Sequence, residues 1–522
     1  MAGSTDLITS VLDIKQLVAE NAVQFSMVKE ISIPGEIKKI ERVETEITGL
    51  IGEIAEDEAR VEGTLILRGF YLTGEGKEEE TEMEEDFFQL IPLPGIEHGG
   101  KGGDLNLKVY PRVELTEMDK LVCEEGRSIF AAAAVIEIFA LCYREINLEV
   151  VSEIPGGDPG KAIKEKLFWE NFIAMEGEVV SLPSQIDLNK PAARIQGVNS
   201  KLEDVTWDIE QDMVRIEGYL INQISYIQES SGETRDESSK ERFSHSLKVP
   251  GAQEGMKVKG YPRVEGIKHK IDPRERTRVE QEVRINLFAL VKEDIITEVI
   301  CQEEEIPLSL PGERLLLYQP VRELSEELSF STEVELEVPV KKIAWPGELG
   351  FHSIEGDMEE NYLKIKGSLD SKIIYVDELT GGIGEENFAE NFSHKFDVPE
   401  KDEGMILFIY PRLEMVDYEI MEDGKRVKQN AAVRLNVKIV DIEEQWVCVK
   451  GEEKVVESKG EEAAGGTVIV VYVMQEEDSI FNVAQRFNVS IDAIMRANKI
   501  EDPDLIYPGQ KILVPGNTDA RW

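Results

Sequence analysis

The feature that most constrains this chain is a five-residue word that occurs three times. Tyr110–Glu114 and Tyr261–Glu265 both read YPRVE, and Tyr410–Glu414 reads YPRLE. The words begin about 150 residues apart, which is the length of one ordinary domain. The spacing therefore predicts one module repeated three times, and we call the three copies the first, second and third repeat.

Other landmarks keep the same phase. The segments RVEGTL, RIEGYL and KIKGSL precede the three words and end at Leu65, Leu220 and Leu369. Between these landmarks lie DFFQLIPLPG, RFSHSLKVPG and NFSHKFDVPE, and after the words we align IEIFAL, INLFAL and LNVKIV. The glycines Gly63, Gly218 and Gly367 indicate either a β-bulge or a close approach of another backbone segment, and the sequence leaves both open.

The hydrophobic period within each repeat is that of a β-strand. From Val279 the chain reads VEQEVRINLFALV, with apolar residues at every second position. Alternation of this kind places apolar and polar side chains on opposite faces of a sheet. In the third repeat the same pattern runs through Val433, Leu435, Val437 and Ile439. The prolines Pro34, Pro183 and Pro339 are expected to end or edge strands, because proline lacks an N–H donor.

We therefore predict a mainly β protein with three tandem antiparallel β-sandwich-like repeats and a small βααβ domain at the C-terminal end. The predicted boundaries are 1–156, 157–311 and 312–450 for the repeats, 451–466 for a flexible charged linker, and 467–516 for the small domain.

The charge balance excludes some classes of partner. The 522 residues include 58 Lys and Arg against 104 Asp and Glu, which gives a formal net charge of −46. Such a chain would be repelled by nucleic acid and by anionic lipid. The acidity indicates either simple solubility or a basic partner surface.

The cysteines and the apolar segments indicate a cytoplasmic protein that does not insert into a membrane. Four cysteines, Cys123, Cys142, Cys301 and Cys448, show no C-x-x-C spacing and favour a reducing compartment. The N-terminus has no basic segment followed by an apolar run, as an export signal would. The run IFAAAAVIEIFAL from Ile129 is too short to cross a bilayer, so we expect a buried strand there.

The sequence offers no pattern typical of an enzyme. Five histidines are widely spaced, and no H-E-x-x-H motif or G-x-S-x-G elbow is present. The segment from Gly95 to Lys101 matches only the start of a phosphate-binding loop. His245 and His394 share the word FSH, for which we favour a structural hydrogen bond over a ligand or base. We predict no catalytic residues, no metal and no cofactor.

The last part of the chain changes character. Residues 451–466 are glycine, charged and small residues, which is typical of a linker. Val468–Met474 is a β-branched run, Asp478 and Ser490 are candidate helix N-caps, and Lys511–Val514 is a candidate final strand.

Val468–Pro515 resembles the LysM domain through DSIFNVAQRFNVSIDAIMRAN and DPDLIYPGQKILVP. Domains of this family usually bind N-acetylglucosamine polymers in a shallow groove. The resemblance implies a groove for a partner or a glycan at Asp478, Ser479 and Ile480 on one side and Leu505, Ile506, Tyr507 and Pro508 on the other. Glu477 stands where the family commonly has glycine.

The large repeats resemble the SPOCS domain through FSHSLKVPGAQEGMKV and the YPRVE word. SPOCS repeats followed by LysM are similar to the SipL-like family of spore coat assembly proteins, and more distantly to the SpoVID-like proteins. The resemblance implies a non-enzymatic scaffold in the mother-cell cytoplasm, at the forespore surface and spore coat. Its implied partners are coat proteins, above all the stage IV coat ATPase bound by LysM. The alternative is a protein that binds peptidoglycan at the spore cortex.

Overall fold

A computed structural model describes most of the chain, which divides into two compact units, Met1–Gly451 and Glu452–Trp522. In the first unit the described residues are 7–96, 105–124, 126–154, 163–301, 312–344, 347–359, 361–398, 405–422 and 424–450. In the second unit they are 468–473, 494–495, 498, 500 and 511–516.

Each repeat consists of antiparallel strands in a fixed order. The first repeat contains β1 (Ile8–Pro34), β2 (Ile37–Ala55), β3 (Glu58–Thr73), β4 (Glu78–Pro92), β5 (Leu105–Glu124) and β6 (Arg127–Glu153). The second contains β7 (Ile163–Asp187), β8 (Ala192–Glu210), β9 (Met213–Gln228), β10 (Thr234–Lys248), β11 (Lys257–Ile271) and β12 (Arg278–Cys301). The third contains β13 (Gly312–Glu335), β14 (Val340–Ile343), β15 (Glu348–Met358), β16 (Tyr362–Asp377), β17 (Ile383–Asp397), β18 (Met405–Ile420) and β19 (Arg426–Cys448).

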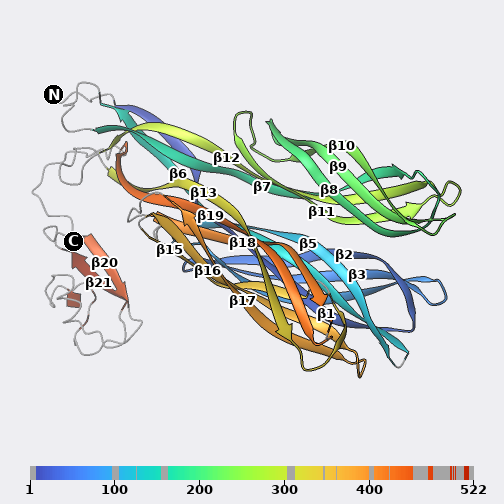
Figure 1. The fold of residues 1–522 in the computed structure, drawn as a ribbon. Coiled ribbons are helices and arrows are strands. Elements are labelled where there is room, and N and C mark those ends of the chain that lie inside the picture. Colours follow the sequence, from blue (N-terminus) through green and yellow to red (C-terminus); the bar gives the residue numbers. More distant parts are fainter. Residues whose placement is uncertain are drawn as a thin grey trace, which may run out of the picture. The chain divides into compact units, whose positions relative to one another are not determined.

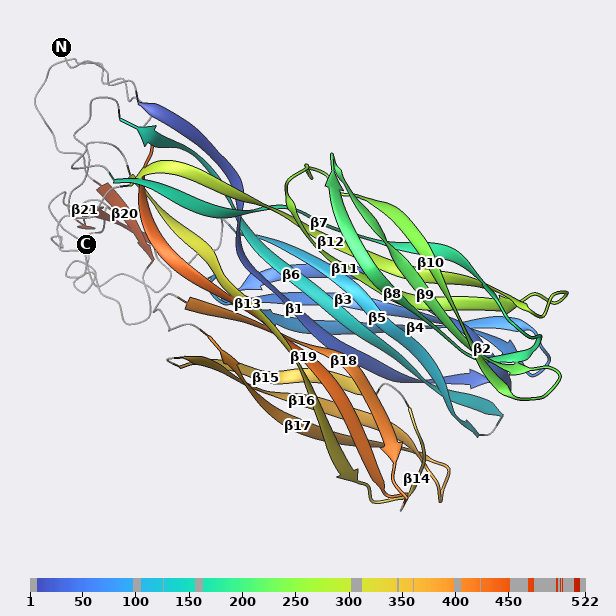
Figure 2. The ribbon, with the colours of Figure 1, turned by 45° about the horizontal axis from the view of Figure 1, so that its top comes forward.

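The pairing confirms the predicted sandwich-like architecture. In one sheet of each repeat the last strand lies between the first and the fifth, as in β1-β6-β5, β7-β12-β11 and β13-β19-β18 (Figure 2). The other sheet is a meander, β8-β9-β10 in the second repeat (Figure 1) and β2-β3-β4 in the first (Figure 2). In the third repeat β14 and β15 together take the place of the second strand beside β16 and β17.

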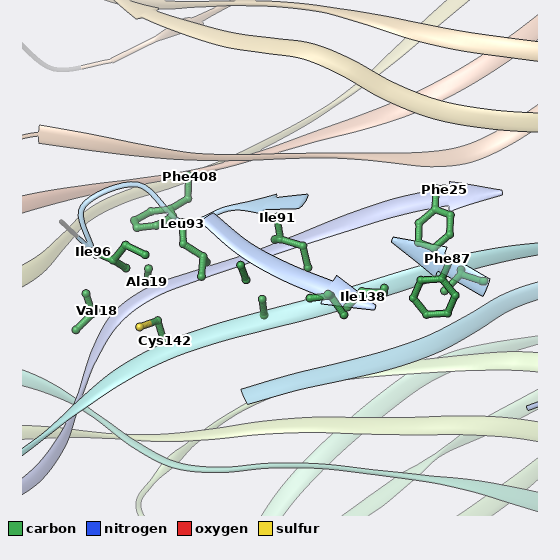
Figure 3. Packing of buried hydrophobic residues seen from close by; sticks show 14 of the residues in the cluster. Val18, Ala19, Phe25, Phe87, Ile91, Leu93, Ile96, Ile138, Cys142 and Phe408 are labelled. Atoms are coloured by element: carbon green, nitrogen blue, oxygen red, sulfur yellow. The ribbon is translucent and has the colours of Figure 1, made fainter. Parts of the chain in front are cut away.

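The alternating residues identified in the sequence form the sandwich cores. Val283, Ile285, Leu287, Ala289 and Val291 of β12 are fully buried in the core of the second repeat. The corresponding stretch of β19 is buried in the third. In the core of the first repeat the rings of Phe25 and Phe87 pack with their centroids 5.6 Å apart (Figure 3). Burial of this many large apolar side chains, at about 1.5–3 kcal/mol each, is the main force that holds the sheets together.

The three landmark glycines make room for a phenylalanine. Gly63 lies opposite Phe87, and a Cβ added to Gly63 would lie 2.7 Å from the Phe87 ring. Gly218 lies opposite Phe243 in the same way, and Gly367 lies opposite Phe392. The register between the second and third strands is also irregular at each of these glycines, because it skips Gly63, Gly218 and Gly367. The bulge interpretation is therefore confirmed, and a ring of the fourth strand lies close to each glycine as well.

The repeats share a further core outside the three sandwiches. In each repeat the beginning of the first strand and the end of the last strand contribute to this core, and these six strand ends pack together through buried apolar side chains. This shared core contains Leu12, Ile14, Ile146, Val150, Leu167, Trp169, Val299, Cys301, Leu315, Leu317 and Val447. Because no repeat can bury these side chains alone, the three sandwiches form one body.

The run from Ile129 is the buried strand that we expected. It lies in β6, where Phe130, Ala132 and Ile136 are almost completely inaccessible. Pro34 ends β1, and Pro183 lies within β7, opposite Glu282 of β12. Among the described residues β7 pairs with β1 only at Asn171, so that around Pro183 it is paired on the β12 side alone and forms an edge, as expected for proline.

The register corrects one detail of our alignment. Tyr110 pairs with Phe139, Tyr261 with Phe288, and Tyr410 with Asn436. The third equivalent of IEIFAL and INLFAL is therefore VRLNVK, two residues earlier than the predicted LNVKIV. Asn436 consequently occupies the position that is phenylalanine in the other two repeats.

In the second unit, β20 (Val468–Val473) pairs with β21 (Lys511–Gly516) in an antiparallel ladder. These strands confirm the two predicted ends of the βααβ module. Ile494 and Met495 are helical, and Ile494 and Ile512 are buried. The proposed linker 451–466 lies outside the described residues.

Candidate functional site

The LysM groove predicted from the sequence lies outside the described residues. This applies to all of its members, Asp478, Ser479, Ile480, Leu505, Ile506, Tyr507 and Pro508. The groove therefore stays a prediction, and the described geometry concerns the three YPR words and their surroundings.

The three words occupy equivalent places in β5, β11 and β18. In each strand the glutamate of the word is the extra residue of a β-bulge, because the register skips Glu114, Glu265 and Glu414. A bulge re-aims the side chains on either side of it. The repeated word thus marks an irregularity at the same point of each fifth strand.

Arginines from all three words meet at one buried centre. Arg112 forms ion pairs with Glu137 and with Glu114, the latter at 2.6 Å. Arg263 of the second repeat also pairs with Glu114, and Arg412 of the third reaches Glu114 at 3.1 Å and Glu137 at 3.9 Å. Both glutamates are inaccessible to solvent. We call these five side chains the arginine centre.

The arginine centre connects the three repeats through direct contacts. Arg112 also donates a hydrogen bond to the backbone carbonyl of Tyr261, at 3.1 Å. Burial lowers the pKa of Arg112, and attraction by Glu137 opposes this shift. Burial lowers the pKa of Arg263 to about 9, with repulsion from Arg412 acting in the same direction. Glu114 and Glu137 supply the negative charge that compensates the buried guanidinium groups.

Aromatic side chains pack beside this centre. Tyr110 stacks on Phe288 of the second repeat with a centroid distance of 4.4 Å, and Phe139 stacks on Phe288 at 4.9 Å. Phe139 also contacts Tyr261 at 5.2 Å and Tyr410 at 6.4 Å. The tyrosine of every word therefore belongs to one cluster of rings, which joins the repeats as the arginines do.

A second charged network links the repeats. Lys292 reaches Glu20 at 2.7 Å and Glu170 at 3.4 Å, and Lys438 reaches the same carboxylates at 2.9 and 3.2 Å. Burial acts to raise the pKa of Glu20, but attraction by Lys292 and Lys438 outweighs it, so that the pKa lies well below its usual range. Sequence reasoning missed these residues and Glu137, because such pairs cannot be identified in a chain with so many acidic residues.

The two histidines of the FSH words take part in polar contacts within their own repeats. His245 lies 3.2 Å from Glu178 of β7, and His394 lies 3.1 Å from Glu326 of β13. Each pair joins the fourth strand of its repeat to the first strand. This geometry agrees with the structural hydrogen bond that we favoured.

All four cysteines lie in the described residues, and none forms a disulfide; Cys123 is exposed and the others are buried. Burial raises the pKa of Cys142 and of Cys301 to about 12. Within the described ranges, no cluster of His, Cys, Asp or Glu is suited to hold a metal ion. The same ranges include no helical segment with the length and hydrophobicity needed to span a bilayer.

Comparison with known families identifies two domains. Residues 191–272 match the SipL SPOCS domain, and residues 472–515 match the LysM domain. The SPOCS match lies in the second repeat and covers β8 to β11. No curated protein matches the chain significantly. The chain thus combines a SipL-type SPOCS domain with a LysM domain, as its sequence predicted.

These two families fit a protein associated with the spore coat. Both are families of binding or scaffold domains, for which a non-enzymatic role is usual. The SipL match favours contacts with coat proteins, and the LysM match favours contacts with peptidoglycan.

Proposed function

We propose that this protein is a non-enzymatic adaptor of the spore coat. The observation that carries the proposal is the presence, in one chain, of a SipL-type SPOCS match and a LysM match that fall in two separate compact units. Linked units can hold two partners at once, because linkage raises the effective concentration of the second partner.

In this proposal the three repeats, with boundaries 1–156, 157–311 and 312–450, act as one body. The arginine centre and the shared core support this, because they join strands of all three repeats. The LysM domain, 467–516, follows the linker 451–466 and contacts the stage IV coat ATPase. The protein acts in the mother-cell cytoplasm, at the forespore surface, and helps to recruit coat layers.

The LysM groove is tested by calorimetric titration of the full chain with the purified coat ATPase and with chitin oligomers. The adaptor proposal expects binding of the ATPase without binding of sugar, and loss of that binding in Ile480→Asp and Tyr507→Ala. A chain that ends at Gly451 serves as the control and should bind neither. Binding of chitin oligomers without the ATPase would instead support the peptidoglycan alternative.

Glu477 offers a second test of specificity. A side chain and a charge at this position hinder the approach of a sugar that would otherwise pack on bare backbone. Glu477→Gly should therefore increase the affinity for chitin oligomers and leave that for the ATPase unchanged. If the affinity for chitin oligomers is unchanged in Glu477→Gly, then Glu477 is not the reason why the domain prefers a protein to a sugar.

A further inference from the structure

The three repeats meet at junctions that are equivalent by register but differ in their side chains. Where the first repeat meets the second, Tyr110 packs on Phe288 and over Gly177, which lies opposite Phe288 in the sheet. A Cβ added to Gly177 would lie only 1.9 Å from the Tyr110 hydroxyl oxygen. The glycine and the phenylalanine together make this junction tight.

The third repeat lacks both of these features. Asn436 stands in place of Phe288, and its cross-strand partner Ser325 stands in place of Gly177. Ser325 donates a hydrogen bond to the Asn436 side chain, at 2.9 Å. Among the described residues, the ring contacts of Tyr261, the equivalent of Tyr110, are with Phe139 and Phe288 and not with a ring of the third repeat.

A cavity of about 320 Å³ lies at this junction. Five aromatic rings from the three repeats line it, namely Phe139, Tyr261, Phe288, Phe408 and Tyr410. The volume lies at the lower end of the range of small-ligand pockets, which is about 300–1,000 Å³. The position that holds a phenylalanine ring in the other two repeats thus opens into a space with aromatic walls.

The polar groups of the cavity differ in how well they are paired. Lys438 is neutralised by Glu20 and Glu170, as described above. The side chain of Lys259 is half exposed, and its ammonium lies 3.7 Å from Glu323. Lys259 also interacts with the Tyr261 hydroxyl and, through charge, with Glu20. The Tyr410 ring lines the cavity, but its hydroxyl is inaccessible to solvent. Lys259 is therefore the group that can serve a ligand carrying a carboxylate.

We propose that this cavity is a binding site for a planar aromatic group that carries a carboxylate. The ring packs among the aromatic side chains that line the cavity, where stacked and edge contacts are favourable. The carboxylate pairs with Lys259. The proposal is independent of the LysM domain, because every lining residue belongs to the three repeats.

The test uses the full chain and indole-3-propionate as the probe, with calorimetry or ligand-observed NMR as the readout. Indole supplies the ring without the acid, and cyclohexanepropionate supplies the acid without an aromatic ring. We expect indole-3-propionate to bind most tightly. The acidic peptide acetyl-Glu-Trp-Glu-amide shows whether the aromatic group belongs to a protein or to a small molecule. If the peptide binds more tightly than indole-3-propionate, the natural ligand is a side chain of a protein partner. If the peptide binds more weakly, the natural ligand is a small molecule.

Asn436→Phe restores the residue of the other repeats and should fill the cavity. We expect it to weaken the binding of indole-3-propionate at least about tenfold. Asn430→Phe is the matched control, because Asn430 accepts a hydrogen bond from Ser331 in the same geometry, at 2.9 Å, and does not line the cavity. This control should leave the affinity within about twofold of the original.

A second variant keeps the test valid if Asn436→Phe fails to fold. Lys259→Gln changes a half-exposed side chain and should weaken indole-3-propionate about two- to fivefold while leaving indole unaffected. Failure of both indole-3-propionate and the peptide to bind the full chain would overturn the proposal. Equal weakening by the variants at Asn436 and Asn430 would also overturn it.

Discussion

Glu137 allows the most direct test of the arginine centre. Glu137→Gln keeps the shape of the side chain but removes one of the two buried carboxylates that face three guanidinium groups. Two unit charges about 4 Å apart interact by on the order of 4 kcal/mol at an effective dielectric constant of about 20. Removing one member of a buried ion pair typically costs about 3–5 kcal/mol.

We therefore expect Glu137→Gln to lower the free energy of unfolding by about 3 kcal/mol, measured by urea denaturation. The shift in melting temperature shows how many residues unfold together, because the entropy of unfolding scales with that number. A loss of about 3 kcal/mol lowers the melting temperature by about 3 °C if Met1–Gly451 melts as one body, and by about 10 °C if a single repeat melts alone.

The control is Glu327→Gln, which breaks the exposed pair between Glu327 and Arg434, at 2.7 Å. Exposed pairs contribute at most about 1 kcal/mol, so this variant should remain close to the original protein. Equal and small losses in the two variants would refute the claim that the arginine centre holds the repeats together.

Three further predictions concern the described body. Gly177→Ala should lower the free energy of unfolding by about 2 kcal/mol or more, because the new methyl group would overlap the Tyr110 hydroxyl. Gly197 has open space around it, so Gly197→Ala should be nearly neutral in the same denaturant titration. A thiol reagent should modify Cys123 in the folded protein and the other three cysteines only after unfolding; rapid modification of all four would contradict their burial. The pKa of Glu20 is lowered in the folded state, so its ion pairs stabilise the protein at pH values above the ordinary pKa of 4.5, and this stabilisation is lost as the pH falls below 4.5. Lys438→Met removes one partner of Glu20 and should therefore reduce the loss of stability between about pH 5 and pH 3, as measured by urea denaturation.

The β-sandwich could be predicted because it depends on local information. Alternation of apolar residues specifies which face of a strand is buried, and the phase of the three words specifies the repeat. The buried faces of β12 and β19 were therefore correct residue by residue. The run from Ile129 was also recognised as a strand, because it aligned with those segments.

The alignment of the third repeat was wrong by two residues for a physical reason. A shift of two residues along a strand leaves every side chain on the same face of the sheet. Periodicity is therefore blind to such a shift, and the phenylalanine that would have fixed the phase is replaced by Asn436. Only the pairing with Tyr410 distinguishes the two alignments.

The meeting of the three words could not be predicted from the sequence. Arg112 and Arg412 lie in different repeats and are brought to the same carboxylates by the packing of whole sandwiches. Repetition of the word indicated a common role, but not that the copies contact one another. The LysM groove was inferred from resemblance and stays a prediction, because its residues lie outside the described ranges.

The adaptor proposal is tested most directly by labelling Cys123 with a fluorophore and sedimenting the protein with polymerised coat ATPase. Cys123 is exposed and lies in the body of repeats, so the label reports where that body goes. The intact chain should carry the label into the pellet, whereas a mixture of the fragments 1–451 and 452–522 should leave it in the supernatant. Label that stays in the supernatant with the intact chain would contradict the proposal.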